Sequence, residues 1–335
     1  MLVLNAEQIR PLATMPALIE CLRAAFAAEW VVPVRQVVSS PGGDGDRLLV
    51  SMPAFSPEGG GVVKLATVFP DNPAHGRPTV QAAILVFSDA GKPVALLDGT
   101  FVTLLRTGAA SALASTYLSR TNSAHLVIIG TGALAPHMAA AHCAARPISR
   151  VSVCGRRRER ARETASVIRS VVDSHVEVLV PESVEDTVGV ADIVSCCTSS
   201  ALPVLAGKWL RPGTFVDLVG SFSPTKREAD DDVMRSSRVF VDTLQGTLSE
   251  AGDVIDPIER GVIDRNCIEG ELADLVRGHV TGRRSDDEII VFKAVGTAIE
   301  DLAAAQLIVS ATSDGGVGQN AQGLAAMPDV IPHGF

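Results

Sequence analysis

Two glycines, at residues 130 and 132, stand where an apolar run meets an alanine-rich segment. The run, residues 126–129, predicts a strand, and the segment after the glycines predicts a helix. Glycine permits a tight turn and lets backbone amides approach a pyrophosphate, while the amides at the helix start face the phosphates. A second strand follows after about 20 residues, as a dinucleotide site requires, so a plain glycine loop is the weaker interpretation. The residues assigned to this part of the site are Gly130, Gly132, Ala133 and Leu134.

The second strand, residues 151–154, ends without a carboxylate. In NAD sites an Asp or Glu at this place binds the ribose 2′-hydroxyl, whereas arginine suits the 2′-phosphate of NADP. At least two of the arginines that follow are expected on a solvated helix face, and Arg156, nearest the strand, is the first candidate for the phosphate. The predicted cofactor is therefore NADPH, with NADH as a weaker alternative. The residues assigned here are Gly155, Arg156, Arg157 and Arg160.

The composition is that of a well-buried globular protein. The chain has 335 residues, of which 47% are hydrophobic and 20% charged, enough for two domains with separate cores. A net charge of −9 argues against a general nucleic-acid or anionic-membrane surface. No apolar run reaches the length of a bilayer span and no leader-like segment is found, so a cytoplasmic location is expected. The six cysteines form no CxxC pair, and we infer neither a disulfide nor a metal site.

The chain is predicted to fold as an α/β protein with two domains. From residue 121 onward, short apolar strands alternate with helical or connecting segments, which predicts a doubly wound parallel sheet of the Rossmann type. The residues before it indicate an α+β module. An apolar pattern at residues 289–310 predicts a long helix that returns to this module. The expected domains are a discontinuous one, residues 1–120 plus 300–335, and a Rossmann NADP-binding one, residues 121–299.

Three cations precede the glycine motif in apolar surroundings. Lys64 lies inside a strand, where a buried ammonium needs an anion or a carboxylate, although an edge strand with Lys64 in water is an equal interpretation. Arg106 stands where a helix is expected to start at Thr107, so that its guanidinium and the helix amides would share one anion. Taken alone, Arg106 fits a structural role equally well. For Arg35 the favoured interpretation is a surface side chain whose aliphatic stem covers apolar residues.

Seven short segments, spread over nearly the whole chain, form a joint pattern. They are Met52 to Ala54, Gly61 to Lys64, Leu105 to Ala109, Gly130 to Ala133, Gly282-Arg283, Phe292 to Gly296 and Ile299 to Ala303. In kind and order they resemble the ornithine cyclodeaminase/mu-crystallin family. The resemblance implies that Arg35, Lys64 and Arg106 bind a substrate carboxylate and that Asp301 braces these cations. It also implies a homodimer formed by the non-Rossmann domain.

One departure from the family's pattern bears on the reaction. Cyclodeaminases carry an aspartate in the loop after the fifth Rossmann strand, and aligning this loop places Phe222 there. A phenyl ring accepts no proton, and the arginines after residue 155 favour NADP. Both observations argue against ornithine cyclisation on bound NAD. The Val-Gly-Ser-Phe loop is similar to the branch that reduces Δ1-pyrroline-2-carboxylate to L-proline and Δ1-piperideine-2-carboxylate to L-pipecolate. We therefore expect an oxidoreductase of proline metabolism that reduces a small cyclic imino acid with NAD(P)H.

Ligands of open α/β sheets lie beyond the carboxyl ends of the strands. Lys64 is a candidate for assisting the proton balance at the imine nitrogen, that is, for exchanging a proton there. A bound water is an equal candidate for this role. For Ser221 a simple turn residue is the alternative. The residues expected near the nicotinamide are Cys197, Thr198, Val219 and Ser221 by this rule, and Ala294 and Val295 by the resemblance.

Two kinds of alternative function stay open. One is another amino-acid oxidoreductase, either an ornithine cyclodeaminase or an enzyme like alanine dehydrogenase that acts on pyruvate and ammonia. The other is a non-catalytic protein that binds NADPH and a small acid, as mu-crystallin does. Turnover of pyruvate plus ammonium would support the first, and tight NADPH binding without turnover would support the second.

Overall fold

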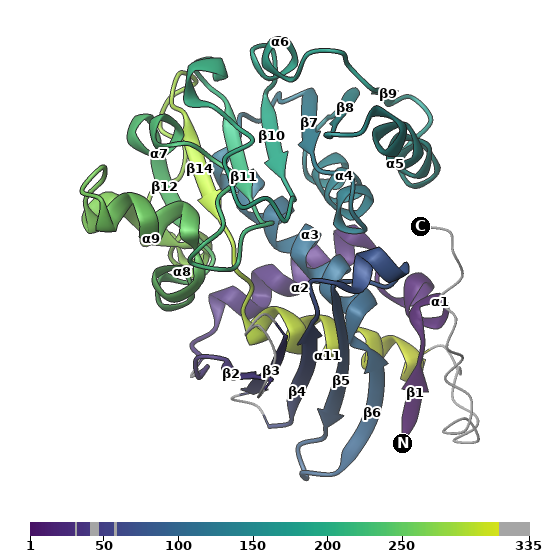
Figure 1. The fold of residues 1–335 in the computed structure, drawn as a ribbon. Helices are drawn as coiled ribbons and strands as arrows, with labels where there is room; N and C mark the ends of the chain where they lie inside the picture. The colour runs from purple at the N-terminus through teal and green to yellow at the C-terminus, as the bar shows by residue number, and fades with distance from the viewer. Residues whose placement is uncertain (31, 41–46, 57–58, 315–335) are drawn as a thin grey trace. The chain divides into compact units, whose positions relative to one another are not determined.

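The computed structural model describes residues 1–30, 32–40, 47–56 and 59–314. The chain divides into two compact units (Figure 1). Of the described residues, the first unit holds Met1–Arg106 and Thr297 to Asp314, and the second holds Thr107–Gly296. The sequence analysis placed the first boundary at residue 120, whereas it falls inside helix α3 (Gly99–Leu118), where no break in the helical pattern marks it. Residues 315–335, expected in the discontinuous domain, lie outside the described residues.

The first unit is built on a six-stranded sheet with the order β1-β6-β5-β4-β3-β2. Strands β1 and β6 are parallel, and the other neighbours are antiparallel. Helix α11 (Ala298–Asp314) packs on β3, β4, β5 and helix α2 (Met15–Ala27). The buried side chains of α2 and the sheet close this core. The strands are β1 (Leu2–Leu4), β2 (Gln36–Ser39), β3 (Leu48–Phe55), β4 (Gly61–Val68), β5 (Val80–Phe87) and β6 (Pro93–Asp98).

The second unit is the predicted doubly wound parallel sheet. Its eight strands have the order β13-β12-β14-β11-β10-β7-β8-β9. From β9 to β11 this is the strand order of a dinucleotide-binding sheet, with the direction of winding reversed between β7 and β10. The strands are β7 (His125–Ile129), β8 (Arg150–Cys154), β9 (Glu177–Leu179), β10 (Ile193–Cys196), β11 (Phe215–Leu218), β12 (Arg238–Val241), β13 (Ile268–Glu271) and β14 (Ile290–Lys293).

Short helices connect these strands. Among the described residues, no helix has both the length and the apolar character that crossing a bilayer requires. The remaining helices are α1 (Ala6–Ile9), α4 (Leu134–Ala145), α5 (Arg158–Val171), α6 (Val184–Val188), α7 (Asp231–Ser236), α8 (Leu244–Glu250), α9 (Gly252–Glu259) and α10 (Leu272–Arg277).

The segment at residues 289–310 differs from its prediction as one long helix. Its first part is strand β14, which lies between β11 and β12, and only the part from Ala298 is helix α11. Gly296, with φ of 85°, separates the two. A short strand buried on both faces has an unbroken apolar sequence, and such a run cannot be told from helix by its periodicity.

A buried carboxylate, Asp217 on β11, joins two helices to the second sheet. It accepts hydrogen bonds from Ser111 of α3 at 2.9 Å and from Ser195 of β10 at 2.8 Å, and His142 Nε2 of α4 lies 3.1 Å away. A buried carboxylate is costly unless it is hydrogen-bonded, so these contacts favour one arrangement of helix and sheet. The start of α4, where phosphates are expected, is thereby held in place.

Candidate active site

The ammonium of Lys64 is buried and paired with a carboxylate. Strand β4 is an interior strand, and Lys64 is only 3% exposed. Its Nζ lies 2.9 Å from Oδ1 and 2.7 Å from Oδ2 of Asp301, on helix α11. The alternative of an edge strand with Lys64 in water is therefore wrong.

Arg106 binds the same carboxylate. Its Nε donates to Asp301 Oδ1 at 3.2 Å, and its Nη1 donates to Glu300 Oε2. Both acidic residues belong to the first turn of α11 and are fully buried. Because α3 begins at Gly99, Arg106 and Thr107 lie inside this helix. The expectation that a helix start at Thr107 would share an anion with Arg106 is wrong, since amides inside a helix are already used by its own carbonyls.

Arg35, just before β2, completes a group that we call the cation cluster: Arg35, Lys64 and Arg106. The pKa of Lys64 is lowered to about 8, first by burial and then by the charges of Arg106 and Arg35, while Asp301 opposes the shift. Glu300 and Asp301 hold Lys64 and Arg106, and Arg35 adds a third positive charge close to Lys64. Cations brought together in a mostly buried setting favour the binding of an anion.

Glycine occurs at positions 130 and 132, after β7, for two different structural reasons. Gly130 has φ of 144°, and a Cβ there would lie 2.7 Å from Sγ of Cys197, so this position tolerates only glycine. Around the Cβ position of Gly132, in contrast, no atom of the described residues lies within 4 Å. Packing does not require glycine at this position, whereas close approach of a pyrophosphate to the backbone does.

The second sheet brings the cofactor candidates to one edge. Its strands are all parallel, so their carboxyl ends lie along the same edge. Each candidate loop begins directly after a strand, and Ala133 and Leu134 form the start of α4. The first residues of these loops are Gly130 after β7, Gly155 after β8, Cys197 after β10, Val219 after β11 and Ala294 after β14.

Two of the arginines after β8 are available to a ligand. Arg158 pairs with Glu182 at 3.1 Å and Arg160 with Glu163 at 2.8 Å, both at the surface. Arg156 and Arg157 are exposed, and within the described part of the chain they have no hydrogen bond or ion pair. Exposed ion pairs contribute little to stability, so Arg160 is still a weak candidate for binding a phosphate. Arg156 and Arg157 are the stronger candidates.

The hydroxyl groups of Ser221 and Thr198 already donate within the protein. Ser221 Oγ donates to the carbonyl of Lys226 in the same loop. Thr198 Oγ1 donates to Glu228 Oε1 at 2.9 Å. The interpretation of Ser221 as a turn residue fits this arrangement, because its proton is not available to a ligand.

The sequence analysis missed several buried charges at the same edge. Lys293 closes β14, and Asp242, after β12, accepts from the amides of Val295 and Gly296. Glu228 is fully buried in the loop region after β11. A charged residue at the end of an apolar run, such as Lys293 after residues 290–292, was the available signal.

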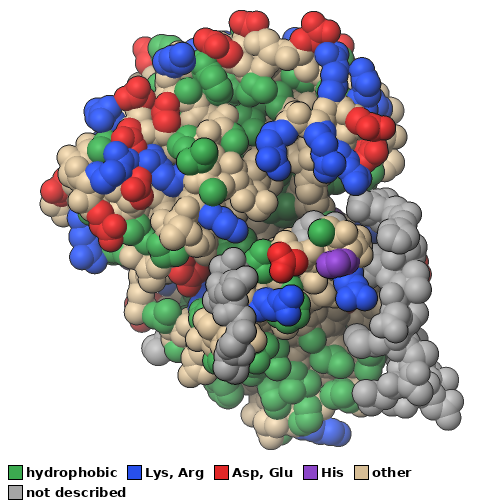
Figure 2. Space-filling view, in the orientation of Figure 1, with side chains coloured by type: hydrophobic (Ala, Val, Ile, Leu, Met, Phe, Trp, Pro, Cys, Tyr) green, Lys and Arg blue, Asp and Glu red, His purple; other side chains and the backbone are tan. Residues whose placement is uncertain are grey.

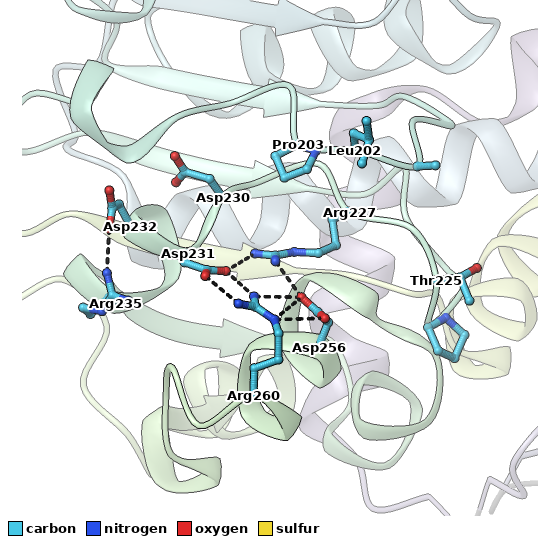
Figure 3. Close-up of a pocket in the computed structure, with 12 residues that line it drawn as sticks. Leu202, Pro203, Thr225, Arg227, Asp230, Asp231, Asp232, Arg235, Asp256 and Arg260 are labelled. Atoms are coloured by element: carbon cyan, nitrogen blue, oxygen red, sulfur yellow. Dashed lines mark hydrogen bonds and ion pairs between the residues drawn. The ribbon is translucent and has the colours of Figure 1, made fainter.

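A pocket of about 680 Å³ in the second unit contains none of the candidate residues (Figure 3). Arg227 pairs with Asp231 and Asp256, and Arg260 pairs with the same two carboxylates. Four aspartates line the pocket against three arginines, so the pocket offers little attraction to an anionic ligand. Its lining residues are Ala201, Leu202, Pro203, Pro224, Thr225, Arg227, Asp230, Asp231, Asp232, Arg235, Asp256 and Arg260.

Nearly the whole chain matches one known family. The model of the ornithine cyclodeaminase/mu-crystallin family matches residues 1–316. The chain belongs to the ornithine cyclodeaminase/mu-crystallin family.

Three relatives of the family span almost the full chain. A Δ1-pyrroline-2-carboxylate reductase from Colwellia psychrerythraea is 38% identical over 94% of this chain and 100% of that protein. The structure of Thermococcus litoralis Δ1-pyrroline-2-carboxylate reductase with NADH and L-proline has a TM-score of 0.91 at 34% identity, covering 96% of this chain and 100% of that one. An archaeal alanine dehydrogenase dimer with bound NAD has a TM-score of 0.87 at 27% identity, covering 95% and 98%.

The different roles of the two glycines predict different effects of substitution. Gly132→Val is expected to leave the thermal unfolding midpoint near that of the wild type while raising the Kd for a dinucleotide about tenfold or more, because its side chain enters the space for the pyrophosphate. Gly130→Ala is expected to destabilise the fold by about 2 kcal/mol or more, since the added Cβ meets Cys197. Scanning calorimetry and NADPH fluorescence titration measure the two effects. Unchanged NADPH binding by Gly132→Val would contradict the assignment of the loop.

Proposed function

We propose that this protein reduces Δ1-pyrroline-2-carboxylate to L-proline, and the six-membered Δ1-piperideine-2-carboxylate to L-pipecolate, with NADPH. The observation that carries the proposal is the buried cation cluster, in which Lys64 and Arg106 are held in place by carboxylates of α11, an arrangement that suits a substrate with a carboxylate. The names of the Colwellia and Thermococcus relatives support the same activity. The cluster accounts for the carboxylate of the substrate, and the names of these relatives favour a small cyclic imino acid.

The cation cluster binds the substrate carboxylate. Lys64 and Arg106 are held by Asp301 and Glu300 before the substrate arrives, so little side-chain entropy is lost on binding. Guanidinium groups form directed pairs with a carboxylate, and an ammonium adds a point charge. With its carboxylate fixed, the ring has one orientation in which its imine carbon is presented for reduction.

NADPH supplies the hydride that adds to C2 of the imine. As the C–H bond forms, the π electrons of the C=N bond pass to nitrogen, which takes up one proton. We assign this proton to Lys64, because within the cluster it alone has a pKa near neutrality, about 8, while arginine keeps its protons. One hydride and one proton convert the cyclic imine to the cyclic amino acid, which balances the reaction.

Two other activities use the same architecture. Ornithine cyclisation is disfavoured because the loop after β11 presents Phe222, 38% exposed, where a cyclodeaminase has an aspartate. Reductive amination of pyruvate is the second candidate, favoured by the likeness to an archaeal alanine dehydrogenase. Pyruvate also has one carboxylate for the cation cluster, so only turnover separates the two reactions.

The direct test of the activity follows NADPH absorbance with purified protein. Rapid oxidation is expected with Δ1-pyrroline-2-carboxylate, with L-proline as product, and no conversion is expected of L-ornithine with NAD. Faster oxidation with pyruvate plus ammonium would instead favour the amino-acid dehydrogenase. Tight NADPH binding without turnover of any of these compounds would favour a non-catalytic binding protein.

The lowered pKa of Lys64 predicts a pH dependence. In the free protein Lys64 is charged below about pH 8 and loses its proton above that value, so kcat/KM for the imino acid should fall as the pH rises beyond 8. Lys64→Arg keeps the charge of the cluster but loses the proton donor, so kcat/KM should be lower at every pH and its fall above pH 8 should disappear. A pH profile of kcat/KM for both proteins measures this. If the fall stays at the same pH in Lys64→Arg, it belongs to the substrate imine and not to Lys64.

The arginines after β8 support a preference for NADPH over NADH. Arg156→Asp is expected to raise the KM for NADPH about tenfold or more and to change that for NADH much less, because only NADPH carries the 2′-phosphate. Arg158→Asp is a matched control, since Arg158 already pairs with Glu182. Equal effects of Arg156→Asp on both cofactors would contradict the assignment.

We infer that the chain forms a homodimer through one face of the first sheet. On the face opposite Lys64, the strands carry exposed apolar side chains, among them Val38, Leu49, Phe55 and Leu65. Figure 2 shows hydrophobic side chains gathered over the strands of this sheet. Contiguous exposed apolar patches mark interaction sites, and the archaeal alanine dehydrogenase of similar structure is a dimer.

The mass in solution tests this interface. The wild type should elute as a dimer in size exclusion with light scattering, and Leu65→Glu should elute as a monomer because a carboxylate would be buried in the contact. Val171→Glu, on helix α5 of the second unit, is the control and should remain dimeric. A monomeric wild type, or a Leu65→Glu variant that stays dimeric, would contradict the proposal.

A further inference from the structure

One fully buried side chain, that of Glu228, joins the loops that follow β10 and β11. Its Oε1 accepts hydrogen bonds from the amide and hydroxyl of Thr198, at 2.6 and 2.9 Å. Its Oε2 accepts from the amides of Gly220 and Ser221, at 2.7 and 3.3 Å. Each carboxylate oxygen thus holds a different loop. We call this arrangement the Glu228 bridge: Glu228, Thr198, Gly220 and Ser221.

The two loops are in close contact at the Glu228 bridge. A Cβ on Gly220 would lie 2.0 Å from the carbonyl oxygen of Thr198 and 2.5 Å from Oε1 of Glu228. No side chain fits there without separating the loops. The absence of a side chain at residue 220 and the carboxylate at residue 228 are therefore parts of one local structure.

A second layer of buried charge supports the bridge. Asp253, in α9, accepts from the amides of Glu228 and Ala229 at 2.7 and 3.0 Å through Oδ1. Its Oδ2 lies 3.1 Å from Nζ of Lys293, at the end of β14. The two atoms are at ion-pair distance although neither has a well-oriented hydrogen-bond partner among the described residues. Through Lys293 the loop that begins at Ala294 is connected to the same network.

The bridge requires an ionised carboxylate. Three amides and one hydroxyl all donate hydrogen bonds to it. A protonated acid would have an O–H group facing these donors, with no acceptor for its proton. The pKa of Glu228 is raised to about 7, first by burial and also by the charge of Asp253, while Lys293 and the amides of Thr198 and Gly220 oppose the shift. The other titratable groups that face it are the buried thiols of Cys196 and Cys197, whose pKa values burial raises well above the ordinary value.

We propose that Glu228 is a positioning residue that holds the loops after β10 and β11 in the arrangement that receives the nicotinamide half of the cofactor. This inference rests on the proposed function, because it presumes that a nicotinamide dinucleotide binds at this edge of the sheet. The adenosine half is assigned to the loops after β7 and β8, and among the described residues no hydrogen bond joins the Glu228 bridge to these loops. Loss of the bridge therefore affects one half of the cofactor and spares the other.

The test compares Glu228→Gln with the wild type in cofactor binding and in turnover. A glutamine has one acceptor oxygen and one donor amide, so it serves only one of the two loops. The Kd for NADPH should rise about tenfold while that for 2′,5′-ADP, a probe of the adenosine half, should stay within about twofold. The kcat for Δ1-pyrroline-2-carboxylate should fall about tenfold or more with its KM within about twofold, since a displaced nicotinamide slows the reaction without changing the cation cluster.

The pH profile provides a readout that a purely structural role would not change. Wild-type kcat should fall below about pH 7, where Glu228 takes up a proton, and this fall should be absent from Glu228→Gln. Thr198→Val, which removes one donor and keeps the amide, is a second variant and should show a smaller loss of the same kind. Glu177→Gln, at an exposed carboxylate on β9, is the control and should equal the wild type.

Two results would overturn the proposal. One is unchanged NADPH affinity and kcat in both Glu228→Gln and Thr198→Val. The other is an equal loss of affinity for NADPH and 2′,5′-ADP, which would give Glu228 a general role in folding. Failure of the proposed function is a separate result, because it would appear as a wild type that binds NADPH yet does not reduce the imino acid, and the binding comparison would still stand.

Discussion

The structure of the substrate site depends on one buried carboxylate, Asp301, which contacts both Lys64 and Arg106. Two cations placed close together in a buried setting repel each other and are poorly solvated, and a shared carboxylate relieves both costs. Removing one partner from such a buried group typically costs about 3–5 kcal/mol. Asp301 lies 237 residues after Lys64 in the chain, so the cluster forms only when α11 has returned to the first sheet. The discontinuous first unit is thus a condition for the site.

The two units contribute different physical properties. The first supplies buried cations, of which Lys64 and Arg106 are held by carboxylates before any ligand binds. The second supplies the shared edge of a parallel sheet, where loops after five strands meet and where Gly132 leaves open space. Buried charges occur in both, and in each case they fix the geometry of groups expected to touch a ligand. Asp301 does so for Lys64 and Arg106, and Glu228 does so for the loops after β10 and β11.

Local patterns were enough to predict much of the fold. The run from residue 126 to the helix after Gly132 has its periodicity and its turn residues adjacent in sequence, so strand, loop and helix were read correctly. Properties set by distant residues were not readable in this way. Whether Lys64 faces water or a carboxylate depends on α11, and whether residues 290–293 form a strand depends on the gap between β11 and β12. The family resemblance pointed to Arg35, Lys64 and Arg106, but it gave no role to Glu228 or to Lys293, although Lys293 lies inside one of the matching segments.

The measurement that most directly tests the account compares two substrates and two proteins. Wild type and Lys64→Met are each assayed with Δ1-pyrroline-2-carboxylate and with the corresponding neutral 2-carboxamide. If the cluster binds the carboxylate, the wild type should prefer the acid by about 100-fold or more in kcat/KM, and Lys64→Met should lose most of that preference because one charge-assisted hydrogen bond is gone. An equal preference for the acid in both proteins would show that the carboxylate is bound elsewhere, and the central claim would be wrong.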